Sequence, residues 1–151
     1  MKISNKADYA LHALFYVASL DGRKLASINE IARAEGIPRE YLAKVLKALV
    51  GQGFLKSARG VAGGYQLARA RKDITFLQVI EAIDGPLEPA NCTIPEAKRS
   101  GHRKGRCPAF KQFDRIKRGL VRDLGAVNFG DIPYEKFYPG RNGRKAKAPK
   151  A

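Results

Sequence analysis

Residues 27–51 hold two amphipathic segments separated only by a tight turn, and this arrangement most limits the possible folds. Ser27 stands three residues before Glu30, which is the spacing of a capping box and predicts a helix over INEIARAE that ends at Gly36. Pro38 is expected in the first turn of the next helix, where no helical hydrogen bond is lost. The predicted apolar stripe of this next helix consists of Leu42, Val45, Leu46, Leu49 and Val50. Two helices joined by so short a turn form a helix-turn-helix.

A hairpin is predicted directly after the helix-turn-helix. Beyond the glycines near residue 52 the apolar period changes to two, and the segments FLKSA and GYQLAR flank a glycine-rich tip at residues 59–64. A helix-turn-helix followed by a hairpin is the plan of a winged helix. The predicted fold class is therefore mainly α with a small β-hairpin.

A helix is predicted over residues 5–20, where apolar side chains recur at helical spacing. Asp8 and His12 lie one turn apart and flank the apolar face of this helix. These polar residues, and the lack of a small-residue cleavage pattern, argue against a signal peptide. No apolar stretch approaches the roughly 20 residues of a membrane-spanning helix. We therefore expect a cytoplasmic protein.

Two further helices are predicted, a short one over residues 75–84 and a long amphipathic one over residues 107–126. The apolar face of the long helix has too few partners in so small a chain, so we expect it to pack on a second subunit. This face consists of Phe110, Phe113, Ile116, Leu120, Val121 and Leu124. The segment VNFGDIPYEKFY is expected to fold back as a short element, and the Gly/Pro/Lys-rich end to be disordered.

The predicted organisation has four parts. They are a winged helix-turn-helix DNA-binding domain (1–84), a cysteine-containing sensor loop (85–106), a dimerisation helix with a return segment (107–138) and a basic disordered tail (139–151).

The charge of the chain indicates a polyanionic partner. Lys and Arg number 29 against 14 for Asp and Glu, which gives a net charge of +15 and a pI near 10.1. Such an excess attracts nucleic acid. No phosphate-cradling loop, paired-carboxylate pattern or catalytic triad stands in the sequence, so an enzyme is not expected. A non-specific RNA-binding or architectural protein is the alternative from another class, and it would show weak sequence preference with a steep salt dependence.

The exposed face of the third predicted helix and the hairpin tip carry the expected DNA contacts. A helix fits the major groove, and glycines in a wing allow backbone amides to approach a phosphate while an arginine enters the minor groove. For any single lysine, simple solvation of the surface is the alternative. The predicted DNA-binding residues are Arg39, Glu40, Ala43, Lys44, Lys47, Lys56, Arg59, Gly60, Gly63 and Gly64.

These segments resemble a known family. ADYALHAL, ASINEIARAEGIPREYLAKVLKAL and above all KSARGVAGGYQLAR are similar to the winged-helix regulators typified by IscR, NsrR and CymR, and ITFLQVIEAIDGP continues the resemblance over about residues 1–125. The resemblance implies a homodimeric repressor that binds a palindromic operator in double-stranded DNA, with long helices crossing at the dimer interface. It also implies, in many members, an iron–sulfur cluster under the cysteine loop.

The two cysteines, Cys92 and Cys107, lie at the ends of a cationic loop. In a reducing compartment such thiols serve as free thiols, metal ligands or a redox pair more often than as a structural disulfide. Cys107 precedes Pro108 near the expected start of a helix, and nearby arginines and lysines stabilise its thiolate. This favours metal ligation and oxidation alike. His102 is the local candidate for a further ligand.

Members of the family that hold a cluster usually supply three cysteines, and this chain lacks the middle one. The resemblance implies that an acidic residue near position 8 can ligate the cluster of the partner subunit. The expected set is therefore Cys92 and Cys107 from one chain with Asp8 and His12 from the other, holding a [2Fe–2S] cluster that senses redox state, nitric oxide or iron–sulfur status. His102 remains an alternative ligand. A cluster-free thiol/disulfide switch, or a repressor controlled by a partner protein, remains the alternative mechanism.

Overall fold

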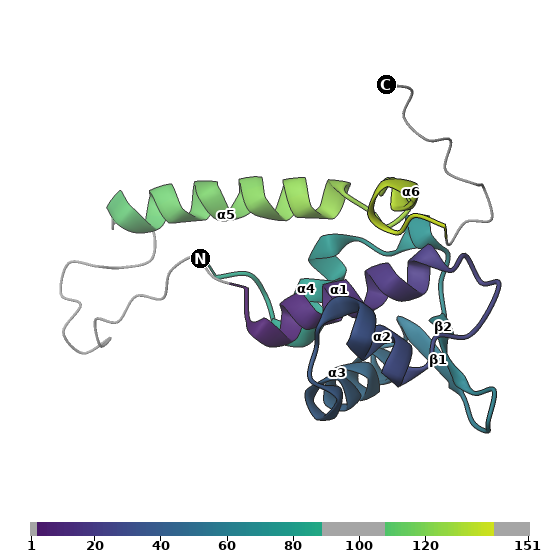
Figure 1. Ribbon diagram of the computed structural model, residues 1–151. Helices are drawn as coiled ribbons and strands as arrows, with labels where there is room; N and C mark the ends of the chain where they lie inside the picture. The colour runs from purple at the N-terminus through teal and green to yellow at the C-terminus, as the bar shows by residue number, and fades with distance from the viewer. Residues whose placement is uncertain (1–2, 89–107, 141–151) are drawn as a thin grey trace.

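The structure is a computed structural model that describes residues 3–88 and 108–140 (Figure 1). Helices dominate, and one hairpin follows the third helix, which confirms the predicted fold class. The elements in chain order are α1 (Asn5–Ser19), α2 (Ile28–Glu35), α3 (Arg39–Gly51), β1 (Leu55–Ala58), β2 (Gly64–Leu67), the 3₁₀ turn η1 (Arg71–Asp73), α4 (Phe76–Asp84), α5 (Pro108–Ala126) and α6 (Tyr134–Phe137). None of the helices within these described ranges is long and apolar enough to cross a membrane.

Side-chain caps begin three of the helices. The Ser27 hydroxyl accepts from the Glu30 amide at 3.2 Å, and the Glu30 carboxylate accepts from the Ser27 amide at 2.8 Å, so the predicted capping box is present. Thr75 and Gln78 form a second capping box at the start of α4. Ser4 caps α1 by accepting from the amide of residue 7 at 3.1 Å. These local signals explain why the sequence located the helix starts within a residue or two.

The turn between α2 and α3 is longer by one residue than expected, because α3 begins at Arg39. Gly36 adopts a left-handed conformation with φ of 65°, which ends α2 at little steric cost. Pro38 is the N-cap of α3 and lies outside its first turn, because its ψ of 126° is extended while its carbonyl already accepts from the Leu42 amide at 2.9 Å. The prediction of Pro38 within the helix was therefore off by one position.

The wing, residues 55–67, is an antiparallel hairpin in which Leu55 pairs with Leu67 and Ala58 with Gly64. The segment before α2 adds a third strand position, since Ala26 exchanges two backbone hydrogen bonds of 2.9 Å with Tyr65. A Cβ at Gly64 would lie 2.6 Å from the Ala26 carbonyl oxygen. This close approach explains the requirement for glycine at the start of β2.

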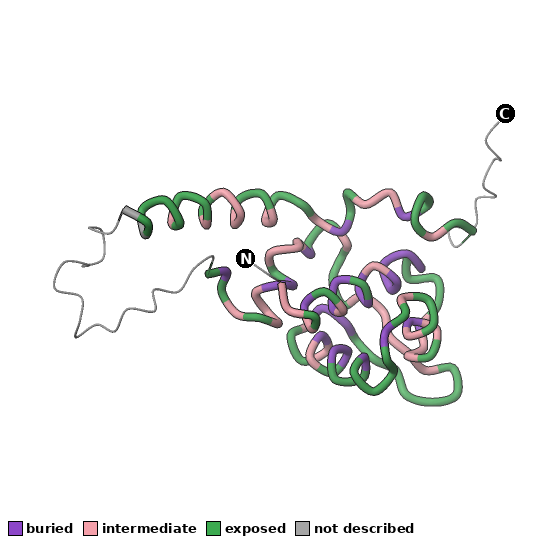
Figure 2. Tube along the Cα trace, turned by 60° about the vertical axis from the view of Figure 1, so that its left-hand side comes forward, coloured by how far each residue is buried: buried purple, intermediate pink, exposed green. Residues whose placement is uncertain are grey.

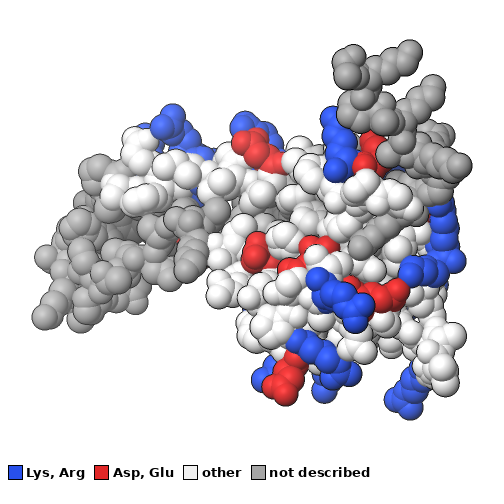
Figure 3. Space-filling view, in the orientation of Figure 1, with Lys and Arg blue, Asp and Glu red and all other residues white. Residues whose placement is uncertain are grey.

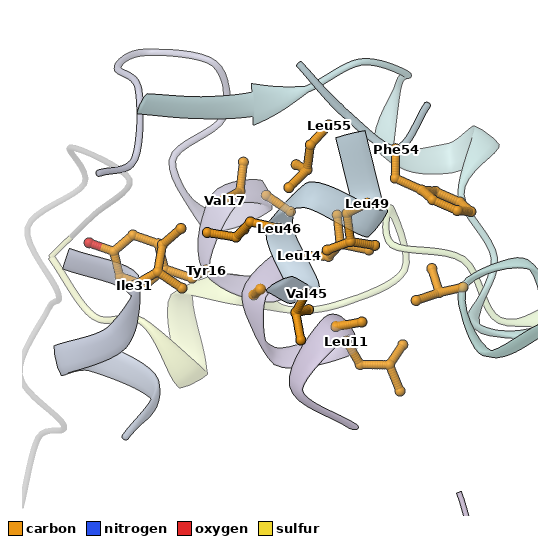
Figure 4. Packing of buried hydrophobic residues seen from close by; sticks show 14 of the residues in the cluster. Leu11, Leu14, Tyr16, Val17, Ile31, Val45, Leu46, Leu49, Phe54 and Leu55 are labelled. Atoms are coloured by element: carbon orange, nitrogen blue, oxygen red, sulfur yellow. The ribbon is translucent and has the colours of Figure 1, made fainter. Parts of the chain in front are cut away.

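The hydrophobic core surrounds α1. Figure 2 shows the buried residues gathered in the compact body, while the long helix α5 is mostly exposed. Much of α1 is buried in this core, including Leu11, Leu14 and Val17. Figure 4 shows Leu14 and Val17 of α1 directed toward Leu46 and Leu49 of α3, and these four side chains are buried. The α3 stripe is as predicted for Leu42, Val45, Leu46 and Leu49, and Val50 is partly buried against the same cluster.

The return segment after α5 enters this core. Phe129 is fully buried, with its ring centroid 5.2 Å from that of Phe15 and 5.4 Å from that of Phe76. Its amide donates to the Ile74 carbonyl at 2.9 Å, and its carbonyl accepts from the Tyr134 hydroxyl at 2.9 Å. Burial raises the pKa of that tyrosine. The short element expected here is α6, and the segment before it is a structural part of the winged-helix body.

The long helix α5 projects beyond the body at its N-terminal end (Figure 1). Its C-terminal end is fastened, because Val121 and Leu124 pack against the core. Farther out, the side chains of Phe113 and Ile116 are 42% and 48% exposed. The predicted unpartnered face is therefore confined to the outer part of α5; the side chain of Phe110 lies outside the described residues.

One arginine joins three parts of the body. The Arg71 guanidinium donates to the Ala18 carbonyl at the end of α1, pairs with Asp21 at 3.0 Å and lies 4.7 Å from the ring centroid of Tyr134. Asp21 itself has a φ of 55° in the tight turn after α1. Arg71 thus links the end of α1, the exit of the wing and the return segment.

Candidate functional site

The outer face of α3 presents the predicted DNA-contacting side chains together. Arg39, Glu40, Ala43, Lys44 and Lys47 are all exposed, on the side of the helix opposite the buried stripe. Figure 3 shows Lys and Arg side chains along the lower edge of the molecule, where Figure 1 places α3 and the wing. A helix with one apolar and one cationic face can keep its core contacts while its other face enters a groove of DNA.

Two contacts orient the start of α3. The Arg39 Nε donates to the Asn29 Oδ1 at 2.9 Å, so a side chain of α2 fixes an arginine of α3. Tyr41 is partly exposed on the same face, and its ring meets that of Tyr9 edge-on at 5.3 Å. Asn29 and Tyr41 were missed at the sequence level. Their signal is weak, because a single asparagine or tyrosine on an exposed helix face is ordinary.

The wing combines a fixed base with an exposed tip. Arg69 donates from Nε to the Gly53 carbonyl at 2.9 Å and from Nη2 to the Gln52 carbonyl at 3.0 Å, and it lies 4.6 Å from the centroid of the Phe54 ring. Lys56 and Arg59 extend into solvent beyond this base.

Glycines shape the tip of the wing. Gly60 is exposed with a φ of 109°, and Gly63 and Gly64 are partly exposed. A Cβ at Gly63 would lie 2.4 Å from the Ala58 carbonyl oxygen, so a side chain there would disrupt the turn. Gly63 is thus needed to close this turn, and contact between the tip and a phosphate stays a prediction.

Asp8 and His12 form a second candidate site, on α1. The Asp8 Oδ1 lies 3.9 Å from the His12 Nε2, and the two side chains are 59% and 46% exposed. The other ring nitrogen of His12, Nδ1, lies 3.0 Å from the Glu35 Oε2. The Glu35 Oε1 accepts from the Tyr138 hydroxyl at 2.8 Å. Glu35 and Tyr138 were missed, because no sequence pattern pairs residues so far apart in the chain.

An apolar groove of about 600 Å³ adjoins His12. The residues that line it come from α1, the end of α2, α4 and the return segment, and include Phe15, Phe76, Val127, Ile132 and Phe137. The last of these is 67% exposed. A soluble surface rarely leaves such aromatic side chains together without a partner.

The α1 pair meets part of what an iron centre requires. Two ligands at about 2.1 Å from a tetrahedral ion lie about 3.4 Å apart, so the 3.9 Å between Asp8 and His12 is closed by a small rotation of either side chain. Cys92, Cys107 and His102 lie outside the described residues. Within the described ranges, no group of three or more His, Cys, Asp or Glu side chains is placed to hold a metal ion. The α1 pair could thus supply half of a four-ligand set.

The chain is similar in sequence to proteins named as HTH-type transcriptional regulators. Over 87 residues the chain is 37% identical to a Mycobacterium tuberculosis protein named by its class as an HTH-type transcriptional regulator, a match that covers 58% of this chain and 54% of the relative. A Rhodobacter capsulatus regulator named as rrf2-like is 37% identical over 93 residues, covering 60% of this chain and 62% of the relative. The chain therefore spans a little more than half the length of these curated relatives.

Solved structures share the fold. CymR of B. subtilis, described as the global cysteine regulator of that organism, has a TM-score of 0.71 at 27% identity and covers 87% of this chain and 95% of its own. IscR of T. potens has a TM-score of 0.72 at 23% identity, covering 100% and 94%, and so shows the fold alone. The oxidized form of CymR from Staphylococcus aureus has a TM-score of 0.67 at 26% identity, covering 85% and 93%.

The family profile decides the class of the protein. The profile of Rrf2, described as "Iron-dependent Transcriptional regulator", matches residues 3–135. That match covers every element of the described fold from α1 through α5 and ends within α6. The chain therefore belongs to the Rrf2 family of transcriptional regulators and not to a class of enzymes.

Proposed function

We propose that the protein is a homodimeric regulator that binds a palindromic operator, and that a [2Fe–2S] cluster controls its affinity for that operator. The observation that carries the proposal is the presence of two separate sites on one small body. One is the cationic face of α3 with the wing, and the other is the exposed Asp8 and His12 pair on α1.

The DNA-binding part rests on geometry and charge. Lys44 and Lys47 stand on the outer face of α3, and Arg59 stands at the tip of the wing. In the proposed complex α3 enters the major groove while Arg59 approaches the adjacent backbone or minor groove. Each lysine that contacts a phosphate releases a counterion, so binding weakens as salt increases. A specific operator binder nevertheless keeps one preferred sequence at moderate salt.

The dimer is supported by surfaces that the single chain leaves uncovered. Phe113 and Ile116 project from the outer part of α5, and the apolar groove beside His12 lies exposed on the body. The outer part of α5 is also basic, with Lys111 and Arg115 exposed. The groove in contrast carries the acidic Asp131 in its wall. In the proposed dimer this part of α5 packs on the second copy, which covers both apolar surfaces.

The metal part joins residues of two chains. Cys92 and Cys107 of one subunit and Asp8 and His12 of its partner are the proposed ligands. When bound, the cluster supplies a one-electron redox centre whose potential rises as histidine replaces thiolate. Asp8 and His12 hold its place on α1, which packs directly on α3 through the core. A coupling of about 1–3 kcal/mol between the two sites changes operator affinity about 5- to 150-fold.

A cluster-free thiol switch is the second candidate. The specific observation in its favour is the two-cysteine composition together with the 26% identity to a CymR structure that is described as an oxidized form. In this version Cys92 and Cys107 lose two electrons and two protons to an oxidant such as a peroxide and close a disulfide. The bond would then constrain the start of α5.

The first experiment separates the two versions. The protein is purified anaerobically, and its visible spectrum, iron and sulfide are measured for the wild type, His12→Ala and the matched variant Lys6→Ala on the same helix. Near-stoichiometric iron and sulfide in wild type and Lys6→Ala, with a lower content in His12→Ala, support the proposed ligand set. Colour that is unchanged in His12→Ala redirects the search to His102. A wild type without iron after reconstitution rejects the cluster, and mass spectrometry of the thiols then tests the disulfide.

A further inference from the structure

The histidine of the proposed metal site is oriented by a residue of the helix-turn-helix. Glu35 is the last residue of α2, and its carboxylate reaches across to His12 on α1. The Glu35 side chain is only 8% exposed, whereas His12 is nearly half exposed. A buried carboxylate therefore holds one edge of an imidazole whose other edge faces solvent.

The hydrogen bonds determine which ring nitrogen is available. The Tyr138 hydroxyl donates to one Glu35 oxygen and the other oxygen lies 3.0 Å from the His12 Nδ1. An ionised carboxylate can only accept, so Nδ1 must carry the hydrogen of this bond. In the neutral ring the lone pair is then on Nε2. Nε2 is the nitrogen that faces Asp8 at 3.9 Å.

Glu35 also lies next to the turn that joins α2 to α3. Gly36 follows it with a φ of 65°, and Pro38 then caps α3. Through its contact with His12, Glu35 therefore connects that ring to the turn before α3. On its far side the same carboxylate holds Tyr138 of the return segment.

We propose that Glu35 is a positioning residue that keeps the His12 Nε2 available as a ligand and connects that ligand to the turn before α3. This inference rests on the proposed cluster function. A histidine that binds a metal commonly donates its other ring N–H to a carboxylate, and loss of that carboxylate weakens metal binding about 10- to 100-fold. Glu35 fills this role without contacting the cluster itself.

The test uses Glu35→Gln, which preserves the shape of the side chain, removes its charge and replaces one of its two acceptor oxygens by an NH2 donor. A glutamine that donates to Nδ1 forces the hydrogen of neutral His12 onto Nε2 and blocks ligation. Tyr138→Phe is the matched variant, because it removes the hydroxyl while the bond between Glu35 and His12 can persist. Glu35→Asp keeps a carboxylate and serves as the conservative variant if glutamine impairs folding.

Two readouts follow the prediction. Long-range ¹H–¹⁵N NMR of histidine-labelled, metal-free protein reports the tautomer of His12, with His102→Ala used for assignment. We expect the Nδ1–H form in wild type and Tyr138→Phe, and loss of that form in Glu35→Gln. In reconstituted protein, the electron paramagnetic resonance spectrum of the reduced cluster should change in Glu35→Gln, and cluster loss to a chelator should be about 10- to 100-fold faster.

The outcomes separate this inference from the proposed function. A wild type that takes up no iron and sulfide rejects the cluster, and with it the role of Glu35 toward a cluster. A wild type that holds a cluster while Glu35→Gln matches it in spectrum and cluster loss overturns the role of Glu35 alone. An Nε2–H tautomer in metal-free wild type also overturns it. Partial recovery of both readouts in Glu35→Asp supports positioning by the carboxylate.

Discussion

Replacing Phe129 with alanine should destabilise the winged-helix body, although the residue lies far from the helix-turn-helix in sequence. Its ring is fully buried against Phe15 and Phe76. Withdrawal of a buried phenyl group from an apolar site costs about 1.5–3 kcal/mol in transfer free energy. Loss of two aromatic contacts and the remaining cavity raise the cost, so we expect a decrease of about 3–5 kcal/mol in the free energy of unfolding.

Urea unfolding followed by circular dichroism measures this decrease, at one fixed protein concentration because unfolding of the proposed dimer depends on concentration. Val61→Ala is the control variant, since Val61 is fully exposed at the tip of the wing, away from the surfaces assigned to the dimer, and should change the free energy of unfolding much less. A Phe129→Ala protein within about 1 kcal/mol of wild type would refute the assignment of the return segment to the core. By the same reasoning, a fragment of residues 1–84 should be less stable than the full chain.

Three further predictions concern the exposed face of α3, the capping box of α2 and the wing. Lys44→Ala and Lys47→Ala should each weaken operator binding and reduce the slope of log affinity against log salt by about 0.9 if the lysine contacts a phosphate, measured by fluorescence anisotropy; an unchanged slope would place that lysine outside the interface. The hydrogen bond from Lys24 lowers the pKa of Glu30 from 4.5 to about 2. The stabilisation by Glu30 is therefore present above pH 4.5 and lost as the pH falls toward 2. The difference in free energy of unfolding between wild type and Glu30→Gln, measured by urea unfolding, should shrink over that range. Because this carboxylate is 39% exposed, that difference stays below about 1 kcal/mol at every pH. Gly64→Ala should loosen the wing, because the new Cβ meets the Ala26 carbonyl oxygen at 2.6 Å, whereas Gly51→Ala has open space around it and should not. Hydrogen exchange at the Tyr65 amide measures the difference. Equal protection of that amide in the two variants would contradict the argument from crowding.

The helix-turn-helix and wing were predictable because their signals are local. The capping box at Ser27 marks the start of α2, and the glycine at position 36 marks its end. The change of apolar period after residue 53 located the hairpin, and the glycine-rich tip located its turn. Each of these signals acts within a few residues, so a linear sequence contains it completely.

The burial of Phe129 in the core and the contact between Glu35 and His12 were not predictable, because both depend on packing between distant parts of the chain. The segment VNFGDIPYEKF has neither a helical nor an alternating pattern, so nothing in it distinguishes the fully buried Phe129 from the exposed Phe137. The pairing of Asp8 with His12 follows from their spacing on one helix. The contact between His12 and Glu35 joins two helices whose packing the sequence does not give.

The attachment of α5 at one end has a geometric consequence. A helix of 19 residues is about 28 Å long, and here Val121 and Leu124 act as the pivot while the opposite end projects from the body. The far end of α5 lies about 20 Å from that pivot, so a rotation of about 5° displaces it by about 1.7 Å. In the proposed dimer the same rotation alters the spacing of the two α3 helices, which must match half-sites about 34 Å apart. In the proposed dimer, a rotation of α5 too small to disturb the core therefore alters how well the two α3 helices match the half-sites of DNA.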